Sequence, residues 1–133
     1  MKVLAFDPGV TTGVACLIEK DGEAEVVWTE EIGMWYTAET KIRIESPDVL
    51  VVEDFRLYPG KAKFLGYNDM PSAQVIGVLK YLAAKYDIPL VLQMAHIKEH
   101  VPADLKEIKG DHMRDAVRHG VYYLAQQPKE GKE

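Results

Sequence analysis

The stretch MKVLAFDPGVTTGVACLIE, residues 1–19, decides the fold. Residues 1–6 are mostly apolar and predict a β-strand that ends at Asp7. Residues 13–19 predict a second strand, and a tight turn leads to a third strand over residues 25–29. We therefore expect the chain to begin with an antiparallel meander. Its first strand ends in a carboxylate, which opens the glycine-containing run DPGVTTG.

After the meander the sequence alternates between helical and extended patterns. The order β-β-β-α-β-α-β-α predicts an α/β fold, a mixed five-stranded sheet flanked by helices. We expect one domain over residues 1–127 and a flexible tail over residues 128–133. The expected elements are a helix over 34–45, a buried strand over 49–52, a helix over 72–85, a strand over 90–92 and an amphipathic helix over 111–125.

Charged side chains stand at the ends of two apolar strands. Glu53 closes the apolar run 49–52 as Asp7 closes the first strand, and a carboxylate in such a place is costly unless something pairs with it. If these strands are neighbours, Asp7 and Glu53 lie side by side. His112 and Asp115 are three residues apart, so they share one face of the last helix. The four residues predict a shared divalent cation.

This ligand set suits phosphodiester hydrolysis. Two divalent ions held roughly 3.5–4 Å apart can bridge the attacking water and the leaving oxygen. Carboxylate oxygens favour Mg²⁺, and an added imidazole makes Mn²⁺ an alternative. The small residues Gly9 and Gly13 near Asp7 would let a phosphate approach the backbone closely.

Composition limits the remaining possibilities. The 133 residues, 47% of them hydrophobic, indicate one packed domain, and the single Cys16 excludes an internal disulfide and a multi-cysteine zinc site. Sixteen basic and 21 acidic residues give a net charge of −5, which argues against a nucleic-acid partner. We see no signal peptide and no membrane-spanning run, so the expected location is the cytoplasm.

The motifs DPGVTTG, VLVVEDF and HMRDAVRHGVYYL together resemble the RuvC-type Holliday junction resolvases of the RNase H-like superfamily, especially the short phage-encoded RuvC-like proteins. The resemblance implies an RNase H-like fold, a homodimer, and cleavage of four-way DNA junctions with two Mg²⁺ or Mn²⁺ ions per active site. It assigns the catalytic metal-binding role to Asp7, Glu53, His112 and Asp115.

The resemblance also implies a DNA-binding surface. One basic position precedes the last helix, and a loop over residues 56–70 carries aromatic and basic side chains but only one acidic one. The residues expected to contact DNA are Lys61, Lys63, Phe64, Tyr67 and Lys98.

Other interpretations remain open. Asp7 could be a turn residue, Glu53 a solvated strand end, and Asp111 the N-cap of the last helix rather than a ligand. Arg118 and His119 are expected on a solvated or DNA-facing helix edge. The alternative functions are an RNA-processing nuclease of the YqgF type and a catalytically silent junction-binding module.

Overall fold

The computed structural model describes residues 1–34, 36–54, 70–101 and 105–128. The order of its strands and α-helices confirms the predicted α/β arrangement, with a short 3₁₀ helix added before the last α-helix. The elements are β1 (Lys2–Asp7), β2 (Thr12–Lys20), β3 (Glu23–Ile32), α1 (Thr37–Glu45), β4 (Val49–Glu53), α3 (Pro71–Lys85), β5 (Leu90–Gln93), η1 (Ala95–His100) and α4 (Asp111–Ala125).

The five strands form one mixed sheet in the order β3-β2-β1-β4-β5. β2 is antiparallel to both β1 and β3, whereas β1, β4 and β5 run parallel to one another. The prediction that the first and fourth strands are neighbours is confirmed. The parallel strands β1 and β4 lie next to each other inside the sheet. Between their polar ends both are apolar and buried, as expected for strands covered on both faces.

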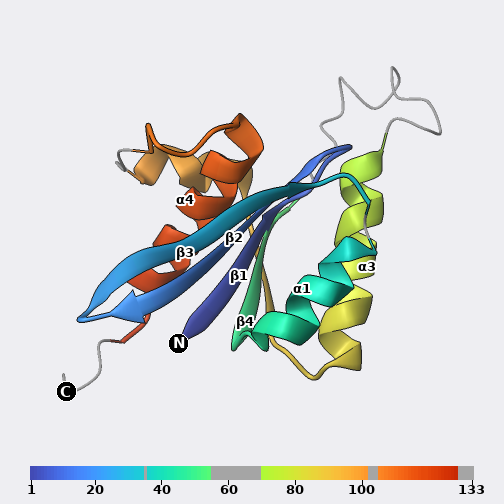
Figure 1. Ribbon diagram of the computed structural model, residues 1–133, viewed down its shortest axis with the longest axis horizontal. Coiled ribbons are helices and arrows are strands. Elements are labelled where there is room, and N and C mark those ends of the chain that lie inside the picture. Colours follow the sequence, from blue (N-terminus) through green and yellow to red (C-terminus); the bar gives the residue numbers. More distant parts are fainter. Residues whose placement is uncertain (35, 55–69, 102–104, 129–133) are drawn as a thin grey trace.

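Helices cover both faces of this sheet (Figure 1). Alternate side chains of β1 point to opposite faces, so Leu4 and Phe6 pack in the cluster that contains α1 and α3. Val3 and Ala5 pack in the second cluster, beneath α4. The sheet is therefore the middle of three layers, with α1 and α3 on one face and α4 on the other.

The main differences from the sequence prediction lie at element ends. Helix α1 begins at Thr37 rather than at residue 34, and β3 extends on both sides of the predicted residues 25–29. β3 is longer because it pairs with β2 along the whole hairpin, so hydrogen bonds between the two backbones keep its polar ends in the extended conformation.

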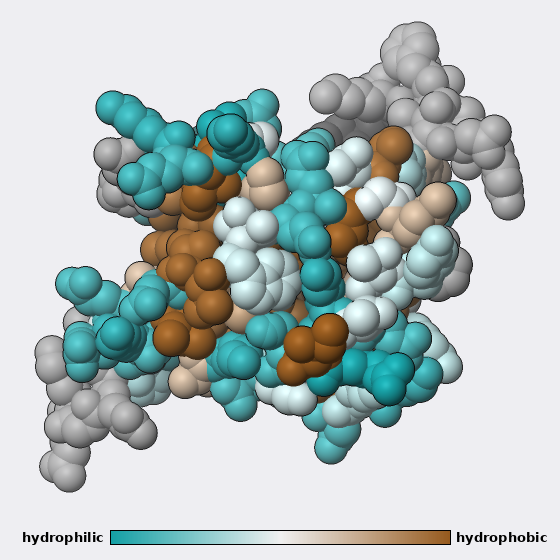
Figure 2. All heavy atoms as spheres, viewed as in Figure 1, coloured by the Kyte–Doolittle hydropathy of each residue, from teal (hydrophilic) through white to brown (hydrophobic). Residues whose placement is uncertain are grey.

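On the face drawn in Figure 2, apolar side chains gather on the side of β3 and α4, whereas most of the remaining surface is hydrophilic. No helix in the described part of the chain is long and apolar enough to cross a membrane.

Candidate metal and active site

The parallel strands end together at one edge of the sheet. Asp7 closes β1, Glu53 closes β4 and Gln93 closes β5, with Glu53 directly paired with Gln93 in the register. The carboxyl ends of parallel strands are the common location of binding sites in open α/β sheets. Three polar side chains are thus brought together by strand direction alone, although 86 residues separate Asp7 from Gln93.

Glycine lets the first turn of α4 lie directly on this edge. Gly13 pairs with Asp7 across β1 and β2, and a Cβ at Gly13 would overlap the backbone of His112. Gly110, which precedes the helix, has a φ of 99°, a conformation that favours glycine. Gly13 was expected to leave room for a phosphate. That expectation is wrong, because α4 itself fills the space, and the contact places His112 above Asp7.

Asp7 and Glu53 lie side by side and share a hydrogen bond, as the strand ends predict. Burial, together with the hydrogen bond and charge of Glu53, raises the pKa of Asp7 from 3.8 to about 7. Burial alone would also raise the pKa of Glu53. Hydrogen bonds from its neighbours, His119 first among them, outweigh burial and hold the pKa of Glu53 well below its ordinary value. Below about pH 7 the pair therefore keeps one proton, on Asp7.

His112 and Asp115 extend the site from the first turns of α4. The Nδ1 atom of His112 lies 2.9 Å from Oδ2 of Asp7, and the His112 side chain is about half exposed. Asp115 pairs with two basic side chains. Its Oδ2 lies 3.1 Å from Nζ of Lys98, and its Oδ1 accepts a hydrogen bond of 2.8 Å from Arg118.

Lys98 lies between the carboxylate at the end of β4 and the carboxylate on α4. Its Nζ lies 2.8 Å from Oε1 of Glu53 and 3.1 Å from Oδ2 of Asp115, so one ammonium group bridges two carboxylates. Burial opposes the charged form, but these hydrogen bonds raise the pKa of Lys98 and keep it protonated. Lys98 was expected to contact DNA, and in the structure it is part of the carboxylate site.

The donor set fits a divalent cation in its chemistry. Three carboxylates and an imidazole meet at one edge, and they are neutralised by a proton on Asp7 and by the Lys98 ammonium. Within the described ranges, however, no three such groups already surround a single point as metal ligands do. A cation bound here would have to displace the proton and the ammonium, and Asp7, Glu53, Asp115 and His112 are the side chains that could hold it.

Comparison with known proteins gives the fold. No protein-family model and no curated protein matches the sequence. Among solved structures, Thermus thermophilus RuvC matches with a TM-score of 0.72 at 14% identity, over 94% of each chain. The same protein in complex with a Holliday junction substrate matches with a TM-score of 0.75 at 12% identity, also over 94% of each chain. The resolvase of Fowlpox virus with its substrate Holliday junction DNA matches with a TM-score of 0.63 at 12% identity, over 93% of this chain and 97% of that chain.

The chain has the RNase H-like fold. The resemblance seen in the sequence motifs is thereby confirmed at the level of the fold. The likeness extends over nearly the whole chain. The single domain over residues 1–127 stays a prediction, and the expected tail lies mostly in residues 129–133, outside the described residues.

One residue of this RNase H-like site was placed wrongly from the sequence. His119 was expected at a solvated or DNA-facing edge of the last helix, but it is fully buried. Its Nε2 lies 2.9 Å from Oε1 of Glu53 and its Nδ1 lies 2.7 Å from Oε1 of Gln93. The signal was present in the spacing, because residues 112, 115 and 119 follow one face of a helix. No sequence pattern marked Gln93 as part of the site.

Two other expectations have clear outcomes. Asp111 is not the N-cap of α4, since Gly110 occupies that position; Asp111 is the first helical residue, is exposed, and pairs with Arg114. Arg118 lies partly exposed beside Asp115, at the edge of the site. The remaining residues expected to bind DNA, Lys61, Lys63, Phe64 and Tyr67, lie outside the described residues.

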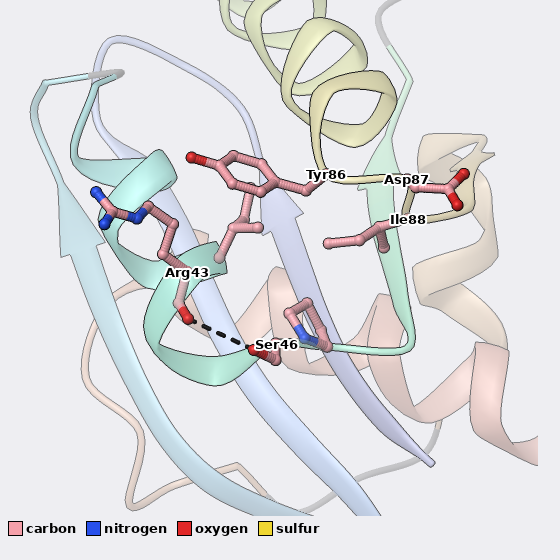
Figure 3. A pocket seen from close by; sticks show the side chains of 7 residues that line it. Arg43, Ser46, Tyr86, Asp87 and Ile88 are labelled. Carbon is pink, nitrogen blue, oxygen red and sulfur yellow. Dashed lines mark hydrogen bonds between the residues drawn. The ribbon is translucent and has the colours of Figure 1, made fainter.

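A pocket is also found away from the carboxylates. A cavity of about 470 Å³ lies between the end of α1 and the turn from α3 to β5 (Figure 3). Ser46 and Ile88, which line it, precede β4 and β5, so this pocket is at the opposite end of the parallel strands from Glu53. It holds no group of carboxylates, and the candidate active site is an open edge of the sheet instead.

Proposed function

We propose that the protein is a divalent-metal-dependent endonuclease that cleaves four-way DNA junctions. The observation that carries the proposal is the meeting of Asp7 and Glu53 at the ends of adjacent parallel strands, beneath the first turns of α4. This edge belongs to an RNase H-like fold, and two of its structural neighbours are resolvases in complex with Holliday junction DNA. The site and the fold support the same class of reaction.

In this proposal Asp7, Glu53 and Asp115 hold two Mg²⁺ or Mn²⁺ ions, and His112 completes the site or orients the water. The ions supply a metal-activated water and stabilise the leaving oxygen of the cleaved phosphodiester. Asp7 must lose its proton to become a ligand, so its raised pKa makes the unloaded site sensitive to pH near neutrality. The buried side of the site, formed by β1 and β4, keeps both strand-end carboxylates in fixed positions.

The DNA-binding role proposed for Lys98 follows from its place at the site. A cation bound by Glu53 and Asp115 would compete with the ammonium for the same oxygens. Once released, Lys98 would be free to neutralise a phosphate beside the cleaved bond. Arg118 supplies a second positive charge at the same edge. These two positive charges lie at the edge that DNA would approach, on a chain whose net charge is −5.

We also propose a homodimer, because a four-way junction presents two strands for cleavage related by a two-fold axis. The exposed face of α3 is the candidate interface. Tyr81 is 65% exposed on this face, beside a largely apolar hollow of about 570 Å³ to which Val78 and Leu82 contribute. Sedimentation of the wild-type protein and of Tyr81→Glu, with and without junction DNA, tests the assembly. A monomeric wild type in both conditions would contradict it.

Cleavage of matched substrates tests the function. We expect the protein to cut a four-way DNA junction in Mg²⁺ and in Mn²⁺, to leave a linear duplex of the same arm sequence intact, and to stop in excess chelator. Preferential cleavage of structured RNA would indicate the RNA-processing alternative. Tight junction binding without cleavage under any metal condition would indicate a silent binding module.

A further inference from the structure

His119 occupies a position that no other imidazole of the described chain shares. It lies on α4, two turns after His112, and its side chain is fully buried. Both ring nitrogens have partners from the ends of two different strands, Glu53 of β4 and Gln93 of β5. Burying a polar ring costs free energy unless such partners are present, so this arrangement fixes the ring in one orientation.

The direction of the hydrogen bond to Glu53 follows from the donors available. An ionised carboxylate only accepts hydrogen bonds, so Nε2 of His119 must carry the proton that it donates to Oε1 of Glu53. Nδ1 faces Oε1 of Gln93, to which it donates in the charged ring. In the neutral ring Nδ1 accepts instead, with the Gln93 amide turned so that its nitrogen takes the place of Oε1. The donation to Glu53 is the same in both cases, and it does not depend on the protonation state of the ring.

Oε1 of Glu53 thus has two donors with different properties. Lys98 is partly exposed and also bonds Asp115, so its ammonium can leave when another cation arrives. His119 is enclosed by the sheet and held by Gln93, so its N–H stays in place. One carboxylate oxygen is therefore fixed permanently from within the core, while Glu53 keeps its contact with Asp7.

We propose that His119, held by Gln93, is a positioning residue that fixes the Glu53 carboxylate for binding a divalent cation. The inference rests on the proposed function, in which Glu53 is a metal ligand. Hydrogen-bonded partners of ligating groups typically change metal affinity by about 10–100-fold when they are removed. Because His119 acts through Glu53 and does not reach the substrate, its loss should alter cation binding even without DNA.

A pair of variants of similar length isolates the donor. His119→Met removes the N–H but keeps an apolar side chain, whereas His119→Gln retains an N–H near the position of Nε2. Mn²⁺ binding to the full chain, measured by calorimetry with the metal alone, should weaken about 10-fold in the Met variant. The Gln variant should recover most of this loss. Leu124→Ala is the control, because it lowers the packing of the same helix without touching Glu53.

Thermal unfolding in chelator shows which variants are folded and how stable each one is. The Mn²⁺ affinities are then compared only between folded proteins. Equal Mn²⁺ affinity of His119→Met and Leu124→Ala overturns the inference, as does a Gln variant no better than the Met variant. If His119→Met does not fold, Gln93→Met replaces it as the test, because this variant keeps the His119 ring but removes the side chain that holds it. The Mn²⁺ affinity of Gln93→Met should fall several-fold, and an unchanged affinity overturns the inference. A wild type that binds no Mn²⁺ overturns it as well. A wild type that binds Mn²⁺ with the expected order of variants but cuts no junction overturns the nuclease function alone.

Discussion

Replacing Asp7 with Asn should stabilise the metal-free protein at alkaline pH. In the wild type, burial and the adjacent Glu53 raise the pKa of Asp7 to about 7, whereas the value is 3.8 without these effects. The folded protein therefore holds a proton that the unfolded chain releases. The stability that this proton provides is complete below pH 3.8 and is lost as the pH rises to about 7.

The size of the effect follows from the same two values. A rise in pKa from 3.8 to about 7 corresponds to about 4 kcal/mol, at about 1.4 kcal/mol for each pH unit between them. Asn cannot ionise, yet its amide can still donate to Glu53 and accept from His112. Because Asp7 and Glu53 titrate together, part of this free energy is shared between them. We expect Asp7→Asn to gain about 2–4 kcal/mol over the wild type at pH 8.5. The gain at pH 5 should be about a third of this, because there the wild type has lost only the part that falls between pH 3.8 and pH 5.

Urea unfolding in excess chelator at several pH values between 5 and 8.5 measures this difference directly. Asp111→Asn is a matched control, because Asp111 is exposed and its pKa is lowered by the hydrogen bond from Arg114. That substitution should not stabilise the protein as the pH rises. Equal gains for Asp7→Asn at pH 5 and pH 8.5, or a loss at pH 8.5, would refute the burial of a protonated Asp7.

The same variant distinguishes the effect of Asp7 on cleavage from the effect of its negative charge on DNA binding. Asp7→Asn removes a proposed metal ligand, so junction cleavage should fall by orders of magnitude. It also removes a negative charge from the edge that faces the phosphates, so junction affinity in chelator should hold or rise. A purely structural Asp7 would instead lose folding, binding and cleavage together. A folded Asp7→Asn protein that cuts like the wild type would end the catalytic assignment.

Three further predictions concern the surroundings of this pair. Gly13→Ala should destabilise the protein by about 1–3 kcal/mol in urea unfolding, because its Cβ would overlap the His112 backbone, whereas Gly77→Ala, with nothing within 4 Å, should not. Lys98→Met should lower the thermal stability of the metal-free protein and tighten Mn²⁺ binding in calorimetry; unchanged affinity would mean that ammonium and cation do not compete. His112→Asp should keep junction cleavage with a changed metal optimum while Asp115→Asn loses it, and wild-type cleavage by both variants would remove α4 from the site.

Strand direction and helix spacing account for what the sequence could predict. Asp7 and Glu53 each end an apolar run, and the run before Glu53 is continuous enough to indicate a central parallel strand. Their meeting therefore follows from local patterns. The shared face of His112 and Asp115 follows from helical period in the same way. These arguments need only short stretches of sequence and the general rules of sheet packing.

Helical spacing puts His119 on the same face as His112 and Asp115, but it does not predict that the ring is buried, because burial depends on partners far away in the sequence. An amphipathic pattern assigns a polar side chain to the solvent unless a buried partner is known. Here the partners are Glu53 and Gln93, at the ends of β4 and β5. Gly13 was misjudged for a similar reason. Its small size is visible in the sequence, but the neighbour that requires it, the first turn of α4, is 99 residues away.

The charges at the site argue that it is built around a cation. Three carboxylates gathered at the end of a buried sheet would repel one another, and folding alone gains nothing from placing them there. The metal-free protein neutralises them with a proton on Asp7, the Lys98 ammonium between Glu53 and Asp115, and the Arg118 guanidinium on Asp115. The first two of these can leave, whereas the hydrogen bond from His119 remains. A stable fold would be reached more simply with apolar residues here, so these carboxylates support the proposed cation, which would take the place of the proton and the ammonium.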